Sequence, residues 1–230
     1  LADPPYNIGK DYGNNKTKCP TADYCTWASA WITEAMRILA EDGILYIYGL
    51  PEILAHVQVS CCSAWHVRWL QWHYTNKTVP SAKFWQRSHE SVLMVWKRKP
   101  FPYFNRDAVR VPYTKGFLKG AAGKKRKCSK GRFSKGDKDT VYKAHAGGAL
   151  PRDVISFPAL AGGAGMHERV SWHKTQKPES ITTTLLKAVL RPEEIQTSVV
   201  VPFAGSGTEC KVAQELGMAW TGFELNGDYV

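Results

Sequence analysis

The sequence predicts an α/β fold in which a mainly parallel sheet carries helices on both faces. Helical and strand-like patterns alternate along most of the chain, as they do where crossover helices join parallel strands. The continuous apolar run Ile44–Tyr48 is typical of a strand buried on both faces. Residues 199–224 have the pattern of a strand, a glycine-rich turn, a helix and a second strand, a unit that places a ligand at the turn.

The chain begins with a strand end and a helix. Leu1–Ala2 has strand character, and because a buried strand has about five or six residues, we expect this strand to be cut short. Residues 21–40 predict a helix, with large apolar side chains on one face at helical spacing. These side chains are Trp27, Trp31, Ala35, Ile38 and Leu39.

The next elements continue the alternation. Pro51, which suits a first helical turn, begins a second predicted helix that runs to Val59. Two more strands are predicted at 67–74 and 91–97. The loop between them, residues 76–89, is rich in Lys, Arg and aromatic side chains.

A basic segment then interrupts the pattern. Residues 115–138 are dense in Lys, Arg and Gly, a composition that does not build a core. Such a segment suits an arm that follows a phosphate backbone, and the alternative is a solvated flexible loop. Phe117 and Phe133 lie among the charges and favour nucleic-acid contact. The candidate contact residues are Lys124, Lys125, Arg126, Lys127, Lys130 and Arg132.

The alternation returns after residue 150. An amphipathic helix is predicted at 180–190, followed by strands at 197–201 and 219–223 that flank a helix ending at Leu216. Gly217 caps that helix. We therefore predict a domain made of two halves, 1–100 and 151–230, with an insertion at 101–150.

Composition limits the class of protein. The 230 residues are 43% hydrophobic, enough for a core, and carry a formal net charge of +11, which fits a polyanionic partner such as nucleic acid. The six cysteines show no C-x-x-C spacing, so no zinc site or disulfide framework is predicted and a reducing compartment is favoured. No apolar run reaches the roughly 18 residues of a membrane span.

The tetrapeptide Asp3-Pro4-Pro5-Tyr6 has the chemistry to hold a planar amino group. Proline nitrogens donate no hydrogen bond, the carbonyls around them can accept one, and the Asp3 carboxylate is a further acceptor. Tyr6 offers a ring on which a base can stack. The loop 7–19 that follows is placed to close over such a ligand. For the tetrapeptide taken alone, the alternative is an ordinary turn in a surface loop.

The glycine-rich turn predicts a nucleoside-cofactor site. Glycines let the backbone approach a ligand closely, and Glu224, about 20 residues after the turn, is placed to accept hydrogen bonds from ribose hydroxyls. A dinucleotide cofactor is disfavoured because Cys210 occupies the position of the third glycine.

Three motifs resemble those of the S-adenosylmethionine-dependent amino-methyltransferases that modify exocyclic nitrogens of DNA bases. Asp3–Tyr6 resembles their catalytic motif, 202–208 resembles their cofactor motif, and 173–178 resembles their His-Pro-Thr-Gln-Lys-Pro segment. The order of these motifs, which span nearly the whole chain, resembles the permuted β-group. In that group Asp-Pro-Pro-Tyr mostly accompanies adenine, and Ser-Pro-Pro-Tyr mostly accompanies cytosine.

The resemblance implies a Rossmann-like methyltransferase sheet of the seven-strand type, with the basic insertion as a small recognition region. It implies methyl transfer to N6 of an adenine that is flipped out of double-stranded DNA. Asp3, Pro4, Pro5 and Tyr6 would be catalytic. The implied cofactor residues are Phe203, Ala204, Gly205, Ser206, Gly207, Thr208 and Glu224, with Thr175 and Lys177 reaching the methionine carboxylate.

The sequence departs from the family pattern at three positions. Val201 replaces the acid that would help bind the cofactor's ammonium group, Lys174 stands where proline is usual, and Glu209 stands where a second threonine is common. Three alternatives therefore stay open: a cytosine-N4 enzyme, an RNA enzyme, and a non-catalytic nucleic-acid-binding relative weakened at Val201. We expect no metal and no membrane contact, and an intracellular location in the cytoplasm of a prokaryote or as a phage product. A homodimer is left open.

Overall fold

The computed structural model describes residues 1–12, 18–76, 79–101, 103–132, 135–136, 139–163, 165–192 and 195–229. Part of the predicted loop at 7–19 and Phe133 of the basic segment lie outside these residues. The chain separates into two compact units, one formed by 1–105 with 153–230 and the other by 106–152. The second unit overlaps the predicted insertion but starts and ends later in the sequence.

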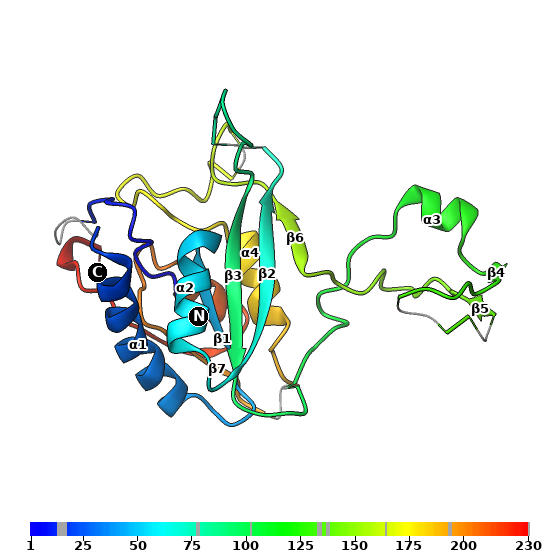
Figure 1. The fold of residues 1–230 in the computed structure, drawn as a ribbon, viewed down its shortest axis with the longest axis horizontal. Coiled ribbons are helices and arrows are strands. Elements are labelled where there is room, and N and C mark those ends of the chain that lie inside the picture. The colour runs from blue at the N-terminus through cyan, green and yellow to red at the C-terminus, as the bar shows by residue number, and fades with distance from the viewer. Residues whose placement is uncertain are drawn as a thin grey trace. The chain divides into compact units, whose positions relative to one another are not determined.

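A four-stranded sheet forms the centre of the first unit, in the order β1-β3-β2-β6 (Figure 1). β3 is antiparallel to both of its neighbours, with Ile47 opposite Leu93 on one side, whereas β2 and β6 are parallel. The strand bounds are Leu45–Gly49 for β1, His66–Tyr74 for β2, His89–Trp96 for β3 and Val154–Phe157 for β6.

A short first segment lies next to β1. Ala2 forms a parallel bridge with Ile47, and the amino group of Leu1 donates to the carbonyl of Val200 at 2.9 Å. Val200 belongs to β7 (Ser198–Val201), which pairs in parallel with β8 (Ala219–Gly222). The residues just after Ala2, which include the Asp-Pro-Pro-Tyr segment, are therefore held where β7 and β1 come together.

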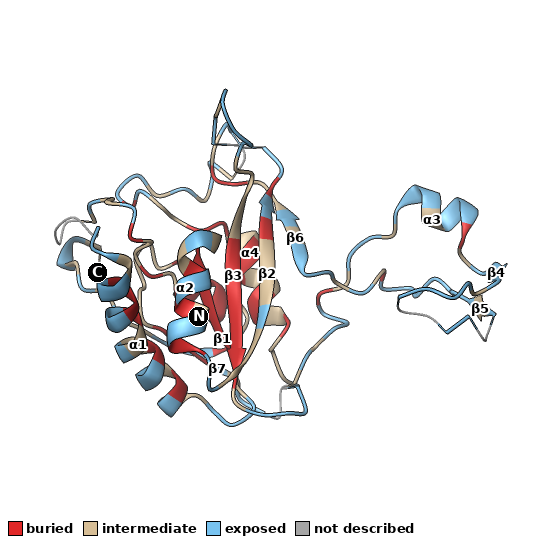
Figure 2. Ribbon diagram, in the orientation of Figure 1, coloured by how far each residue is buried: buried red, intermediate tan, exposed pale blue. Residues whose placement is uncertain are grey.

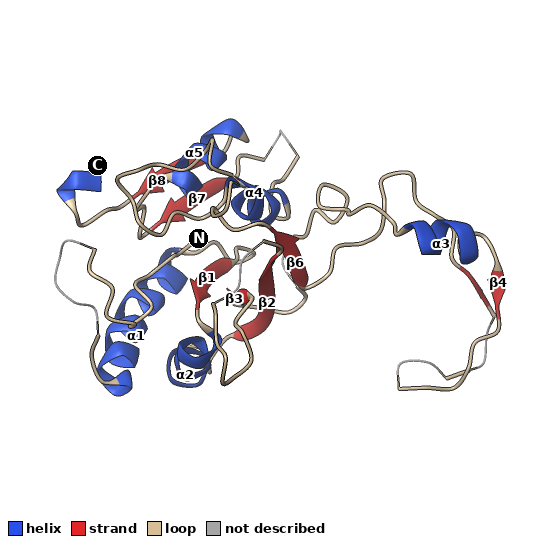
Figure 3. Cartoon of the chain, turned by 90° about the horizontal axis from the view of Figure 1, so that it is seen from above, coloured by secondary structure: helices blue, strands red, loops and turns tan. Residues whose placement is uncertain are grey.

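Helices cover both faces of this sheet (Figure 3). Alternate residues of β1 separate the two layers: Leu45 and Ile47 pack with α1 and α2, whereas Tyr46 and Tyr48 pack with α4 and α5. This alternation is the period-two geometry of a strand. The helix bounds are Thr21–Ile38 for α1, Pro51–Cys61 for α2, Glu179–Lys187 for α4 and Thr208–Glu215 for α5. The predicted α/β class is confirmed.

The face predicted for α1 is wrong in part: Trp31, Ala35 and Leu39 are partly buried against the core, but Trp27 and Ile38 are exposed. Trp27 is 42% exposed and Ile38 is 56% exposed, while the residues that pack toward the sheet are Tyr24, Cys25, Ala28, Ile32 and Met36. Small residues allow close helix packing, and they do not stand out in a pattern of large apolar side chains. The rings of Trp27 and Trp31 instead lie 5.8 and 5.2 Å from the ring of Phe203.

The second unit has little core. Among its described residues, the buried apolar ones are Val109 and Ala121, and most of the others are exposed (Figure 2). A helix not anticipated from the composition, α3 (Lys115–Gly120), is capped by the Thr114 hydroxyl, which accepts from the Phe117 amide at 3.2 Å. Two short strands, β4 (Lys125–Arg126) and β5 (Thr140–Val141), pair in antiparallel fashion.

Candidate active site

A pocket of about 920 Å³ brings the distant sequence motifs of the first unit together. Its walls come from the Asp3–Tyr6 segment, from residues 173–177 and from the glycine-rich turn after β7. Of the predicted residues, those that line it are Asp3, Pro4, Pro5, Tyr6, Thr175, Lys177, Phe203, Ala204, Gly205, Ser206 and Glu224. Gly207 and Thr208 are not lining residues: Gly207 is the N-cap of α5 and Thr208 is its first residue.

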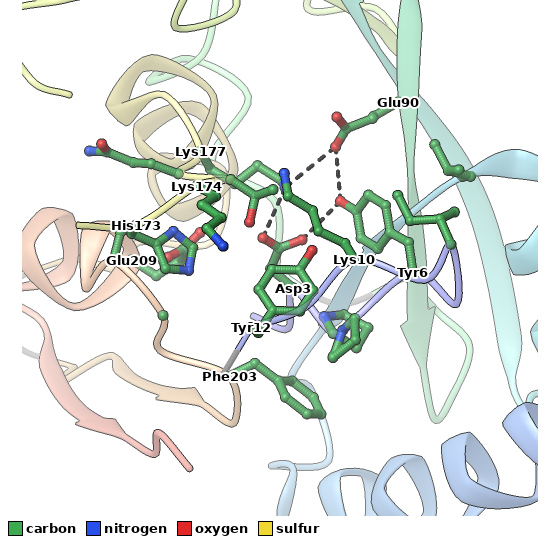
Figure 4. Close-up of a pocket in the computed structure, with 18 of the residues that line it drawn as sticks. Asp3, Tyr6, Lys10, Tyr12, Glu90, His173, Lys174, Lys177, Phe203 and Glu209 are labelled. Carbon is green, nitrogen blue, oxygen red and sulfur yellow. Dashed lines mark hydrogen bonds and ion pairs between the residues drawn. The ribbon is translucent and has the colours of Figure 1, made fainter. Parts of the chain in front are cut away.

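Asp3 and Tyr6 point toward each other at the centre of the pocket (Figure 4). The Tyr6 hydroxyl lies 2.8 Å from Asp3 Oδ1. On the far side of the segment, the Tyr24 hydroxyl of α1 donates to the carbonyl of Pro5 at 2.7 Å. One of the two proline carbonyls is thus already an acceptor within the fold, and the segment is tied to the first helix.

Glu90, at the start of β3, is a site residue that the sequence reasoning missed. Its Oε2 lies 2.8 Å from the Tyr6 hydroxyl, and its Oε1 accepts from the Tyr74 hydroxyl at 2.6 Å. Because Tyr6 has one hydroxyl proton, it can donate to Asp3 or to Glu90 but not to both. The signal in the sequence was an acid directly before the apolar run of a buried strand.

Lys177 joins the two carboxylates. Its Nζ lies 2.8 Å from Asp3 Oδ2 and 3.4 Å from Glu90 Oε2, and the residue is buried. The resemblance implied contact with the cofactor's methionine carboxylate, whereas the structure pairs this ammonium with the catalytic segment. Lys177 Nζ also lies 5.1 Å from the centre of the Tyr6 ring, within the range of a cation–π contact.

Burial and charge pull the pKa values of this cluster in different directions. Burial raises the pKa of Asp3, and the attraction of Lys177 does not fully offset it. Burial also acts against the charge on Glu90, but Lys177 and the two tyrosine hydroxyls outweigh it and lower the pKa of that carboxyl. For Lys177, burial is outweighed by Asp3 and Glu90, so its pKa is raised. Asp3 is therefore the carboxylate in this pair that takes a proton more readily.

The glycine-rich turn packs closely against His173 and is held by Glu224. Gly205 has φ +49°, and a Cβ there would lie 2.9 Å from His173 Nε2, so a larger residue does not fit without movement. Glu224 fixes the turn, because its Oε2 accepts from the Gly205 amide at 2.7 Å and its Oε1 accepts from the Asn226 amide at 2.8 Å. Each carboxylate oxygen retains a second lone pair for a ligand hydroxyl.

Two polar groups around the turn are buried without a partner among the described residues. His173 Nδ1 forms no hydrogen bond, and burial lowers the pKa of this imidazole. Glu209 Oε1 also lacks a partner, and burial raises the pKa of that carboxyl to about 7. Both residues line the pocket. Buried polar atoms of this kind normally find a protein, water or ligand partner.

The remaining predicted cofactor residues support the turn and its surroundings. Thr175 forms a side-chain hydrogen bond with Tyr12. The Ser206 and Thr208 hydroxyls lie 3.0 Å apart, and Gln176 Nε2 donates to Thr208 at 3.3 Å. Phe203 presents its ring beside Trp27, which also lines the pocket.

The predicted nucleic-acid contacts belong to the other unit. All six of Lys124, Lys125, Arg126, Lys127, Lys130 and Arg132 are exposed, and Lys125 pairs with Asp139 at 3.0 Å. The acids of this unit are Asp107, Asp137 and Asp139, against many more Lys and Arg residues, so its net charge is strongly positive.

The described residues hold neither a metal-binding cluster nor a membrane-spanning helix. No group of three or more His, Cys, Asp or Glu side chains there is arranged to hold a metal ion. No described helix has both the length and the apolar character needed to cross a membrane. The cysteines, all six of which are described, are free thiols.

Comparisons with known proteins place the chain in a family. Over its full length it is 28% identical to the DNA adenine methyltransferase YhdJ of Escherichia coli K12, and it spans 72% of that protein. The solved structure of the cytosine-N4-specific PvuII DNA methyltransferase matches with a TM-score of 0.61 and 15% identity, over 100% of this chain and 75% of that one. The M1.HpyAVI–SAM complex matches with a TM-score of 0.56 and 15% identity, over 99% and 82%. The model of the DNA methylase family matches residues 1–230, and the chain belongs to that family.

Proposed function

We propose that this chain transfers a methyl group from S-adenosylmethionine to the exocyclic N6 of an adenine flipped out of double-stranded DNA. The observation that carries the proposal is the shared pocket, in which the acceptor groups of Asp3–Tyr6 face the glycine-rich turn and Glu224. One wall offers hydrogen-bond acceptors for an amine, and the other offers a close backbone approach for a nucleoside cofactor.

The residues around the turn fit S-adenosylmethionine. Gly205, at φ +49°, lets the backbone of the turn approach a cofactor closely, and Glu224 is placed to accept from ribose hydroxyls. The unpartnered Oε1 of Glu209 offers a partner for a cation in a chain that has Val201 where the family has an acid. When bound, the cofactor supplies a methyl group on a sulfonium, and the bond from carbon to sulfur breaks as the bond to nitrogen forms.

Asp3 and Pro4 would hold the amine. The Pro5 carbonyl already accepts from Tyr24, so the Pro4 carbonyl and the Asp3 carboxylate are the acceptors for the two N6 hydrogens. This arrangement draws the nitrogen lone pair out of conjugation and aims it at the methyl group, while Tyr6 stacks on the base. As positive charge develops on the nitrogen, Asp3 stabilises it and takes the proton that must leave. The raised pKa of Asp3 makes it a better proton acceptor.

DNA binding is assigned to the basic second unit. Extruding the adenine costs a few kcal/mol, which binding to the rest of the duplex must offset. The exposed basic residues of the second unit suit the phosphate backbone, where each contact releases counterions. The six free thiols fit a reducing cytoplasm.

Cytosine N4 is the second candidate substrate. It is favoured by the fold shared with the cytosine-N4-specific PvuII enzyme. Adenine is favoured by the Asp at position 3 and by the similarity to YhdJ, which is named as an adenine enzyme.

Asp3→Ala tests the assignment of the amine-holding wall. We expect transfer of labelled methyl to DNA to fall at least about 1,000-fold, because both a hydrogen-bond acceptor and the proton acceptor are lost. Calorimetric binding of S-adenosylmethionine should stay within a few-fold of wild type. Asp23→Ala, which removes an exposed acid from α1, is the control. Near wild-type transfer by Asp3→Ala would overturn the assignment.

A further inference from the structure

Two adjacent aromatic side chains stand almost fully exposed on the connection between β2 and β3. Phe84 is 80% exposed and Trp85 is 89% exposed. The described part of this connection, residues 75–76 and 79–88, extends beyond the ends of the two strands and is largely exposed (Figure 2). Single exposed apolar residues are common on proteins, but neighbouring large aromatics more often mark a surface that binds something.

The connection is held in place at its base. Val79 and Arg87 form an antiparallel bridge, and the Arg87 guanidinium pairs with Glu52 at the start of α2. Nearer the tip, the Phe84 amide donates to the Ser81 hydroxyl at 3.1 Å. The two aromatics are therefore carried by an anchored hairpin.

The hairpin belongs to the rim of the pocket. Val79 and Arg87, the bridged residues, both line the pocket that contains Asp3 and Tyr6. Within residues 75–88 the sequence has three basic side chains, Lys77, Lys83 and Arg87, and no acid. Arg87 is paired with Glu52, and Lys83 stands directly before Phe84 in the sequence. The connection thus combines stacking surface with a basic side chain next to the site proposed for a base, which is the combination that binds nucleic acids.

We propose that Phe84 and Trp85 enter the base stack of the DNA at the gap that the extruded base leaves. This inference rests on the function proposed above. An extruded base leaves its neighbours unstacked, and apolar side chains inserted between base steps recover part of that loss. Stacking of one aromatic side chain on a base tightens binding by about 5- to 150-fold. The pair would favour the flipped state and hold it open while Asp3 and Tyr6 take the base.

An abasic site tests this role without knowledge of the recognition sequence. A short duplex with one abasic position already has the gap, so a side chain that fills gaps should prefer it. Fluorescence anisotropy should show that the wild-type protein binds this duplex about tenfold tighter than the intact duplex of the same sequence. The Phe84→Ala/Trp85→Ala double variant should bind both duplexes alike. Its affinity for the intact duplex should change little, because phosphate contacts dominate there.

Trp220→Ala is the matched control, since Trp220 is an exposed tryptophan of β8 that does not line the pocket. This variant should keep the wild-type preference for the abasic duplex. The inference is overturned if the double variant also keeps it, or if the wild-type protein has no such preference. Methyl transfer by the wild-type protein, measured in parallel, separates the two proposals. If the protein methylates DNA but does not prefer the abasic duplex, only the role of the two aromatics is refuted. If it prefers the abasic duplex through these aromatics but does not methylate DNA, only the proposed function is refuted.

Discussion

Glu90→Gln tests whether the buried carboxylate pair controls the reactivity of Asp3 and Tyr6. The substitution keeps the shape of the side chain and one acceptor oxygen, but it removes the charge that lies 2.8 Å from the Tyr6 hydroxyl and 3.4 Å from Lys177 Nζ. A hydrogen bond to a charged group contributes about 1.5–3 kcal/mol. If that contribution holds Tyr6 and Lys177 in the reactive geometry, kcat should fall about 10- to 100-fold.

The pH dependence should change as well. Burial raises the pKa of Asp3, and the negative charge of Glu90 adds to that effect. Removal of this charge lowers the pKa of Asp3, so Asp3 stays ionised to a lower pH. The acid limb of the kcat profile should therefore move to lower pH in Glu90→Gln, opposite to the direction expected from general damage to the site.

Steady-state transfer of labelled methyl to DNA, measured across pH, gives both results. The KM for S-adenosylmethionine should stay within about threefold, because Glu90 faces the proposed base side of the pocket. Glu215→Gln, which removes an exposed acid of α5, should match wild type. An unchanged kcat and an unmoved acid limb in Glu90→Gln would refute the role given to this carboxylate.

Two further substitutions test the cofactor side of the pocket. Gly205→Ala should weaken calorimetric binding of S-adenosylmethionine at least about tenfold, because its Cβ meets His173 Nε2 in addition to the backbone strain. Gly217→Ala has the same kind of strain at φ +70° with open space around it, so it should leave binding unchanged, and equal losses would contradict the steric argument. Glu209 has a pKa of about 7 in the fold against an ordinary 4.5, so the native state binds the extra proton and loses stability as pH rises through that window. Glu209→Gln should therefore raise the free energy of unfolding at pH 8 by about 3 kcal/mol and change it little at pH 4. Urea unfolding at the two pH values measures the free energy of unfolding. A Glu209→Gln variant that is no more stable than wild type at pH 8 would contradict the raised pKa of Glu209.

The sequence predicts most of the elements because their patterns are local. The strand at 44–48 and the helix at 180–190 are continuous apolar or amphipathic runs, and both occur within a few residues of the predicted bounds. The family follows from three motifs that each lie within a few consecutive residues, and it is confirmed. The face of α1 was only partly predictable in this way, because small residues such as Cys25 and Ala28 become buried through their packing in the cluster shared with α2 and β1.

The arrangement inside the pocket depends on contacts between distant residues. Tyr6 and Glu90 are 84 positions apart, and their hydrogen bond depends on which strand lies beside β1. The motif at 173–178 identified Lys177 as a site residue. Its pairing with Asp3, however, depends on the long-range packing of α4 beside the sheet. Motif spacing identifies the residues of the site, whereas the sheet order decides which of them meet.

The most direct test of the account is to identify the methylated nucleoside. Unmethylated DNA is incubated with the protein and labelled S-adenosylmethionine, and the product is digested to nucleosides and separated. We expect the label in N6-methyldeoxyadenosine, and we expect Asp3→Ala to transfer at least about 1,000-fold less of it. Label in N4-methyldeoxycytidine would contradict the adenine assignment, and the absence of label from wild-type protein that binds both DNA and S-adenosylmethionine would contradict the proposed reaction.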